Sequence, residues 1–244
     1  MTQPAPNSTV PDKGLVARAI GILTSPKATF ETIVAYPRPA VFLLFVCLLL
    51  GVAQGAPQFT EKGRQAALDM QVKSMEGFGM QVKPEVYEAM EKRMAYNGYI
   101  TVVSMFVFVP IAVVFFSALY WVLFNAVLGG TASFKQVLGI TAHSGIIGAI
   151  GALISAPIMY AQGVLSTAGP FNLGALVPFL APENIIAKTL GATSMFQVWG
   201  MFVTGIGLGV LYRRKGSTIG LALIAFYLII TACVFTVFSA FASR

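Results

Sequence analysis

The chain has 244 residues, of which 57% are hydrophobic and only 10% are charged. Soluble domains carry about 25% charged residues, so this composition indicates a membrane protein. The net charge of +7 arises from scattered Lys and Arg residues without zinc-finger, RNP or helix-turn-helix spacing, which argues against a nucleic-acid partner. Two cysteines, Cys47 and Cys233, and a single histidine are too few for a disulfide framework or a Cys/His metal site.

The N-terminal region is expected to be a disordered tail over residues 1–14, which hold three prolines, followed by two short amphipathic helices over 15–36. The helices should be separated at Ser25-Pro26, where Ser is a favourable N-cap and Pro a favourable first helical residue. Their apolar content favours a position along the membrane surface, and a soluble stalk is the alternative. The basic residues expected near lipid headgroups are Arg18, Lys27 and Arg38.

The first strongly apolar run covers residues 40–56 and predicts a transmembrane helix. Its position so far from the N-terminus argues against a signal peptide. The polar insert that follows, 58–97, places Leu68, Val72 and Met75 at helical spacing and starts a second helix at Pro84. We therefore expect a helical hairpin outside the bilayer.

Further apolar runs complete the predicted architecture. Residues 163–192 contain several Gly and Pro residues and should form a loop with short helical pieces. The sequence thus predicts an all-α, polytopic membrane domain over residues 15–244, with five transmembrane helices. The four later spans are placed at 99–128, 137–162, 194–212 and 217–241.

The basic residues are distributed unequally between the two sides of this arrangement. The N-terminal side carries eight basic and two acidic residues, whereas the other side carries eight basic and seven acidic residues. Because Lys and Arg accumulate in cytoplasmic segments, the N-terminus should be cytoplasmic and Arg244 outside, across a cell (inner) membrane.

His143 is the one ionisable side chain, Cys and Tyr aside, within the predicted spans. One interpretation is a proton-sensing or substrate-contacting group in a polar pocket with Asn125 and Gln197. The alternative is a neutral imidazole that hydrogen-bonds across helices near the cytoplasmic end of its span. The short distance along the chain from Lys135 favours this alternative.

Small residues recur at helical spacing and predict close helix contacts. Ser144, Gly148 and Ala152 repeat every four residues in the third span, and Gly205 and Gly209 form a GxxxG pair in the fourth. Small side chains let helix backbones approach one another, either within one chain or between two copies.

Several runs resemble those of a known family. Residues 25–33 are similar to an SPxxTFxxI-like run, and residues 129–136 to a GGxxSFKQ turn. Residues 172–179, NLGALVPF, followed by Phe196 and Trp199, are similar to a later signature. In order and spacing, residues 15–240 resemble the Yip-domain family of five-span membrane proteins, especially its bacterial branch. The resemblance implies a role in trafficking or membrane organisation, but the acidic motif linked with Rab GTPase partners is absent.

The residues do not favour an enzyme. None of the nine acidic residues falls within a predicted span, and neither a catalytic constellation nor a cofactor motif is evident. We expect a non-enzymatic protein of the lipid bilayer that organises membrane or serves as a scaffold for protein partners or for copies of itself. The alternative is a transport component for a small solute or lipid with a pocket at Asn125, His143 and Gln197. A continuous polar cavity open to one side would favour transport, and a dry interior would favour the scaffold.

Overall fold

The computed structural model describes residues 14–77, 80–166, 168–181 and 184–242. Within these ranges the chain is helical, with an isolated bridge between Asn172 and Ser194 in place of any strand. Almost all of the tail predicted to be disordered lies outside the described residues.

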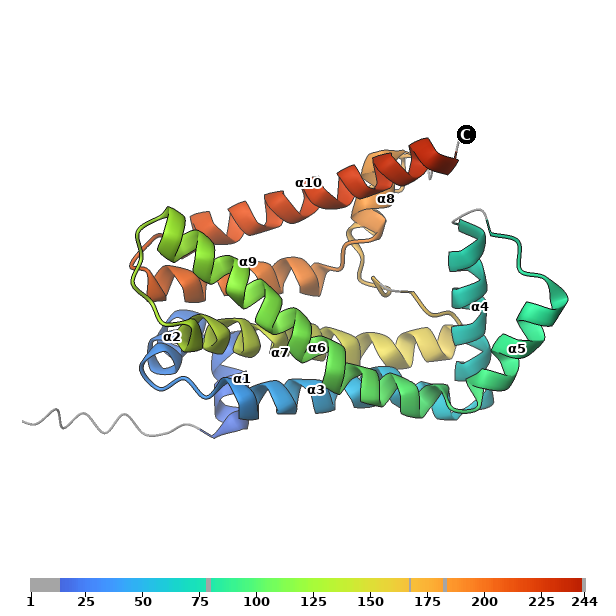
Figure 1. The fold of residues 1–244 in the computed structure, drawn as a ribbon, viewed down its shortest axis with the longest axis horizontal. Coiled ribbons are helices and arrows are strands. Elements are labelled where there is room, and N and C mark those ends of the chain that lie inside the picture. The colour runs from blue at the N-terminus through green and yellow to red at the C-terminus, as the bar shows by residue number, and fades with distance from the viewer. Residues whose placement is uncertain (1–13, 78–79, 167, 182–183, 243–244) are drawn as a thin grey trace, which may run out of the picture.

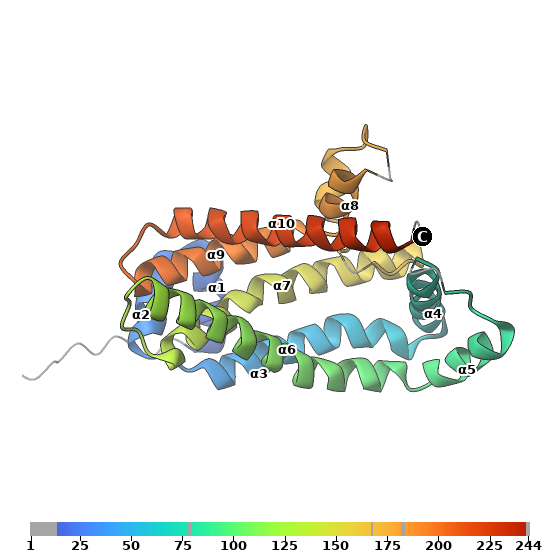
Figure 2. The same ribbon diagram turned by 45° about the horizontal axis from the view of Figure 1, so that its top comes forward.

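Five helices run side by side with alternating direction (Figures 1 and 2). They are α3 (Pro39–Gly55), α6 (Asn97–Val122), α7 (Phe134–Gln162), α9 (Met195–Leu211) and α10 (Gly216–Ala242). Four described stretches are long and apolar enough to cross a membrane, and they correspond to α3, α6, α7 and α10. Helix α9 is equally apolar in character but has only 17 residues; α3 has the same length, and η1 extends it to a stretch of 21 residues. The predicted polytopic all-α architecture is confirmed.

The bundle has two ends of different construction (Figure 1). We call one the turn end; it holds residues 128–133 and 212–215, which join α6 to α7 and α9 to α10. We call the other the hairpin end; it holds α4 (Glu61–Gly77) and α5 (Pro84–Met94). A short 3-10 turn, η1 (Ala56–Phe59), links α3 to α4.

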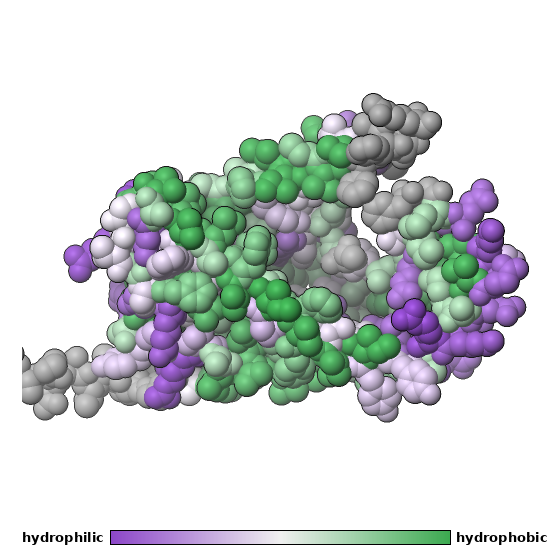
Figure 3. All heavy atoms as spheres, viewed as in Figure 1, coloured by the Kyte–Doolittle hydropathy of each residue, from purple (hydrophilic) through white to green (hydrophobic). Residues whose placement is uncertain are grey.

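Burial separates the central helices from those that face lipid. Only 6% of the most apolar part of α6, and the same share of α10, is buried inside the protein, against 56% for α7. Apolar side chains therefore cover the outer faces of α6 and α10, and polar side chains gather at the two ends (Figure 3). Such a banded surface suits contact with hydrocarbon in the middle and water at both ends.

The α4–α5 hairpin has a small core that Leu165, from the loop after α7, completes. Leu68 and Met94 are nearly or fully buried and contact Val72, Tyr87 and Met90 at its centre. The predicted stripe on α4 accordingly faces α5, while the charged side chains point outward.

The N-terminal helices, α1 (Leu15–Thr24) and α2 (Pro26–Ala35), pack into the turn end rather than lying only on its surface. Ile22, Phe30 and Ile33 are completely buried in the main core. Arg18, expected near headgroups, is 3% exposed, because α1 enters the space between α3 and α9. Pro26 occupies the expected first position of α2, although the Ser25 side chain makes no capping hydrogen bond.

The GGxxSFKQ run has a clear structural basis at the start of α7. Ser133 caps the helix and forms a reciprocal capping box with Gln136. The Gln136 amide also donates to the Val34 carbonyl at 3.2 Å, which ties α7 to α2. Gly129 has a positive φ of 71°, and a Cβ on Gly130 would lie 2.6 Å from the Tyr212 ring. Glycine is therefore required at both positions.

Residues between α7 and α9 form irregular structure at the hairpin end. A 3-10 turn, η3 (Leu173–Leu176), and a short helix, α8 (Ile185–Gly191), match the predicted loop with helical pieces. Helix α8 stands beside α10 and away from the rest of the bundle (Figure 2). The Asn172–Ser194 bridge draws the end of this segment to the start of α9.

Candidate functional site

The central helix α7 is flanked by α3 on one side and α9 on the other, and small residues on α7 leave space between them. A Cβ added at Gly148 would find no atom within 4 Å. One turn further along, the Phe196 ring fills the space over Gly151, at 2.5 Å from such a Cβ. The wedge between α3 and α9 is thus filled over Gly151 and open over Gly148.

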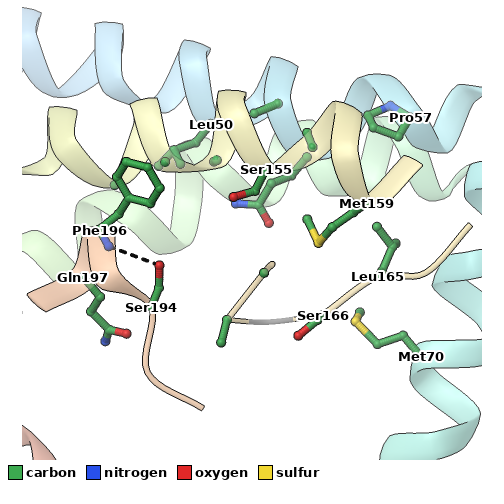
Figure 4. A pocket seen from close by; sticks show the side chains of 18 of the residues that line it. Leu50, Pro57, Met70, Ser155, Met159, Leu165, Ser166, Ser194, Phe196 and Gln197 are labelled. Atoms are coloured by element: carbon green, nitrogen blue, oxygen red, sulfur yellow. Dashed lines mark hydrogen bonds between the residues drawn. The ribbon is translucent and has the colours of Figure 1, made fainter. Parts of the chain in front are cut away.

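This open space is a cavity of about 400 Å³ at the hairpin-end half of the bundle. Side chains from α3, α4, α7 and α9 converge on it, as do residues of the loop after α7 (Figure 4). Its apolar wall is formed by Leu50, Ala152, Met159, Leu165 and Phe196. A cavity of this size falls within the range of small-molecule sites, roughly 300–1,000 Å³.

Among the buried residues that line this cavity, Ser155 has a hydroxyl group without a partner in the described part of the chain. Ser155 on α7 lines the cavity and is 8% exposed. Within the part of the chain that the structure describes, no group hydrogen-bonds to its Oγ, which faces the cavity space. Polar groups in such surroundings are normally satisfied by protein, water or a bound molecule.

Two glutamines line the same cavity near the end of α3. The Gln58 amide nitrogen donates to the Gln54 carbonyl at 2.9 Å, and its oxygen accepts from Asn97 and from the Thr101 hydroxyl. The Gln54 amide nitrogen lies 3.7 Å from the Met105 sulfur, a weak acceptor. These amides join α3 to α6, and none of the described lining residues is charged.

The turn end is closed by a packed core. His143 is fully buried, stacks on Phe42 with ring centroids 3.9 Å apart, and contacts the Gly139 carbonyl through Nδ1 at 2.7 Å. The Arg18 guanidinium lies 3.5 Å from its Nε2. The described lining of the cavity includes neither His143 nor Phe42. This cavity therefore does not reach His143 at the turn end.

The predicted polar pocket of Asn125, His143 and Gln197 does not assemble as one site, since each side chain has separate partners. Asn125 donates to the Ala132 carbonyl at 2.7 Å and accepts from the Tyr212 hydroxyl at 3.0 Å. It thereby ties the end of α6, a short π-helix (Leu123–Val127), to the two turns of the turn end. Its role is to join these segments.

Gln197 alone of the three lines the cavity, at its edge. Its side-chain oxygen accepts a hydrogen bond from the Tyr227 hydroxyl of α10 at 3.2 Å. The residue therefore links α9 to α10, and its remaining amide nitrogen is the part available to a bound molecule.

The predicted packing residues divide into two groups. Ser144 is buried on α7 and donates to the Ile140 carbonyl, and Gly205 and Gly209 lie against the backbone of α10 at Gly220 and Gly216. Gly148 and Ala152 instead border the cavity. Small residues at the same spacing thus serve either close helix packing or the cavity wall. The spacing alone does not distinguish these two roles.

Sequence reasoning did not identify the glutamines near the end of α3 or Ser194 at the start of α9 as cavity residues. Their only signal is an amide or hydroxyl at the edge of an apolar run, which is common at helix ends. As for metals, the described residues contain no group of three or more His, Cys, Asp or Glu side chains that could hold an ion.

Comparison with known proteins gives one match. A family model for the Yip1 domain matches residues 20–238, which span most of the chain and all five helices of the bundle up to the last turn of α10. No curated protein and no solved structure matches the chain. The chain belongs to the Yip1 domain family.

Proposed function

We propose that this member of the Yip1 domain family is a non-enzymatic membrane protein that organises membrane by holding protein partners at its hairpin. The observation that carries the proposal is the construction of the α4–α5 hairpin. Its apolar side chains pack around Leu68 and Met94 together with Leu165, and it stands beyond the apolar band of the bundle (Figure 3). A folded polar unit in this position offers a surface to soluble domains.

The outward face of α5 supplies a chemically distinct surface. Glu85, Glu88 and Glu91 recur every three residues and are all exposed, as are Lys92 and Arg93 at its end. Residues three apart on a helix share a face, so the three carboxylates form one acidic row. A partner with a basic patch would complement this row, and charge complementarity favours its specific approach.

We further propose that the turn end faces the cytoplasm of a cell (inner) membrane. Lys135, Arg213, Arg214 and Lys215 cluster there, and α1 and α2 bring Arg18 and Lys27 to the same end. This accumulation of basic residues follows the positive-inside rule. Five antiparallel helices then place the hairpin and the C-terminus outside.

Transport is the second candidate, and the cavity at the hairpin end is the observation that favours it. The buried contact of His143 with Phe42 at the turn end speaks against a route across the bundle. Flux would require α1 and α2 to leave that core, which would expose Phe30 and Ile33. We therefore favour the scaffold.

Photo-crosslinking in intact cells tests the scaffold. A photoreactive residue at Glu88 should capture a protein partner in a defined ratio. In a second set of variants, the photoreactive residue is moved to the neighbouring exposed Lys92. Replacing Glu85, Glu88 and Glu91 by Lys in these variants should abolish capture. The matched control places the photoreactive residue at Phe108 on the exposed face of α6, where lipid adducts are expected. Capture at Phe108 but not on α5 would contradict the proposal, and a captured second copy would identify the partner as the protein itself.

Topology is tested separately with single cysteines in a variant lacking Cys47 and Cys233. A membrane-impermeant maleimide added to intact cells should label Glu88→Cys and leave Lys215→Cys unlabelled until the cells are opened. Labelling of Lys215→Cys in intact cells would reverse the proposed orientation.

A further inference from the structure

The cavity between α3, α7 and α9 mixes apolar and hydrogen-bonding side chains in its wall. Leu50, Met159 and Phe196 provide apolar surface. Ser155 on α7 and the glutamines Gln54 and Gln58 add hydroxyl and amide groups. The cavity therefore offers both kinds of contact to one ligand.

This combination suits an amphiphilic ligand from the membrane. Helix α3 ends at Gly55, so Gln54 and Gln58 stand where the apolar span gives way to the polar hairpin. A molecule with a hydrocarbon chain and a polar head would find both apolar walls and hydrogen-bonding groups in this cavity. Burial of apolar area next to Leu50 and Phe196 would supply affinity, and hydrogen bonds would fix the orientation.

We propose that this cavity binds a single-chain lipid with an uncharged headgroup, whose hydroxyl or amide hydrogen-bonds to the Ser155 hydroxyl. The Ser155 residue is 8% exposed, and its hydroxyl, which has no hydrogen-bond partner in the described ranges, is accessible from the cavity. No charged side chain is found among the described lining residues, which matches an uncharged head. An isolated charge in such a setting would be costly to desolvate.

The size of the cavity also limits the ligand. At about 400 Å³ it is near the lower end of small-molecule sites. This volume suits one hydrocarbon chain and a small head better than a complete two-chain lipid. The site does not rest on the proposed scaffold role, because it shares no residue with the exposed face of α5.

The test uses the full-length protein in phosphatidylcholine vesicles that contain a small fraction of a monoacylglycerol with a photoreactive group near its head. Irradiation should label the α7 peptide that contains Ser155. Gly148→Phe should reduce labelling by about tenfold or more, because the new ring fills open space and displaces the chain. Ser155→Ala should reduce it by roughly three- to tenfold, the range expected for one lost hydrogen bond.

Two controls complete the test. Leu153→Phe adds an aromatic ring to the lipid-facing side of the same helix, where Leu153 is 36% exposed, and should leave labelling unchanged. A fatty-acid probe with the same chain tests the headgroup and should label the α7 peptide less. Equal labelling of wild type and Gly148→Phe, stronger labelling by the fatty acid, or no labelling of α7 by the monoacylglycerol would each overturn the proposal.

Discussion

The two ends of this bundle are built from the same three helices, yet one is filled and the other is open. At the turn end, α1 and α2 occupy the wedge between α3 and α9, and Phe30 and Ile33 are completely buried there. At the hairpin end the corresponding wedge holds a cavity. The side chains of α7 account for this difference in packing. Its turn-end half carries the larger Ile140, His143 and Ile147, and its hairpin-end half carries the small Gly148, Ala152 and Ser155.

The largest expected effect contrasts a residue of the filled wedge with one of the open wedge. Phe30→Ala should lower the free energy of unfolding by about 3–5 kcal/mol, because it leaves a void in a closed core. Leu50→Ala should lower it less, since Leu50 already borders empty space and makes fewer contacts. Chemical unfolding in mild detergent measures both values. Equal losses would mean that the two ends are packed alike.

A second contrast concerns the contact that holds α10 to the bundle. A Cβ on Gly205 would collide with the backbone of Gly220, so Gly205→Ala should destabilise the protein by roughly 1–3 kcal/mol. Gly200→Ala on the same helix is the matched control, because its nearest neighbour would be 4.0 Å away. The control should be neutral or slightly stabilising. Thermal unfolding of the two variants measures this difference in stability. Similar losses of stability in both would contradict the close α9–α10 contact.

His143 tests whether the turn end is a site or a packed core. His143→Ala removes the ring stacked on Phe42 and the contact near Arg18, and should cost roughly 1–3 kcal/mol of stability. His143→Gln keeps a polar group and should cost less. Lipid labelling at Ser155 should be unchanged in both variants. A change in labelling without a change in stability would instead couple His143 to the cavity.

The smallest effect compares two tyrosine hydroxyls, one at each end. Tyr212→Phe removes the hydrogen bond to Asn125 and should cost about 0.5–1.5 kcal/mol. Tyr227→Phe removes the hydrogen bond to Gln197 beside the cavity and should cost less, because the cavity offers Gln197 an alternative partner such as water. Thermal unfolding of the two variants ranks them. The reverse ranking would show that the α9–α10 tie at the cavity matters more than the turn-end network.

Much of the fold could be predicted from the sequence because long apolar runs and helix-breaking residues have local causes. The apolar run after Pro39 and the capping signal at Ser133 and Gln136 placed α3 and α7 within a few residues of their observed bounds. The bounds of α9 are as close, since the sequence predicts a span at 194–212 and the helix covers Met195–Leu211.

The site was much harder to predict, because its residues come together only in the folded chain. His143 is recognisable in the sequence as a rare ionisable group. Its surroundings are not, because the buried Arg18 and Phe42 beside it come from other helices. Ser155 resembles any small packing residue in the sequence. Only the placement of α3 and α9 shows that its hydroxyl faces open space.

The shortness of α9 has a consequence for the surrounding membrane. Seventeen residues span about 25 Å at 1.5 Å per residue, which is less than the roughly 30 Å thickness of a bilayer's hydrocarbon core. Met195 and Trp199 are exposed on this helix, so lipid beside it meets a shorter apolar height than lipid beside α6. Hydrophobic mismatch of this kind thins the adjacent bilayer and sorts proteins among membranes of different thickness. A bilayer matched to α9 would be thinner there than beside α6, and lipids with shorter chains should then collect next to α9.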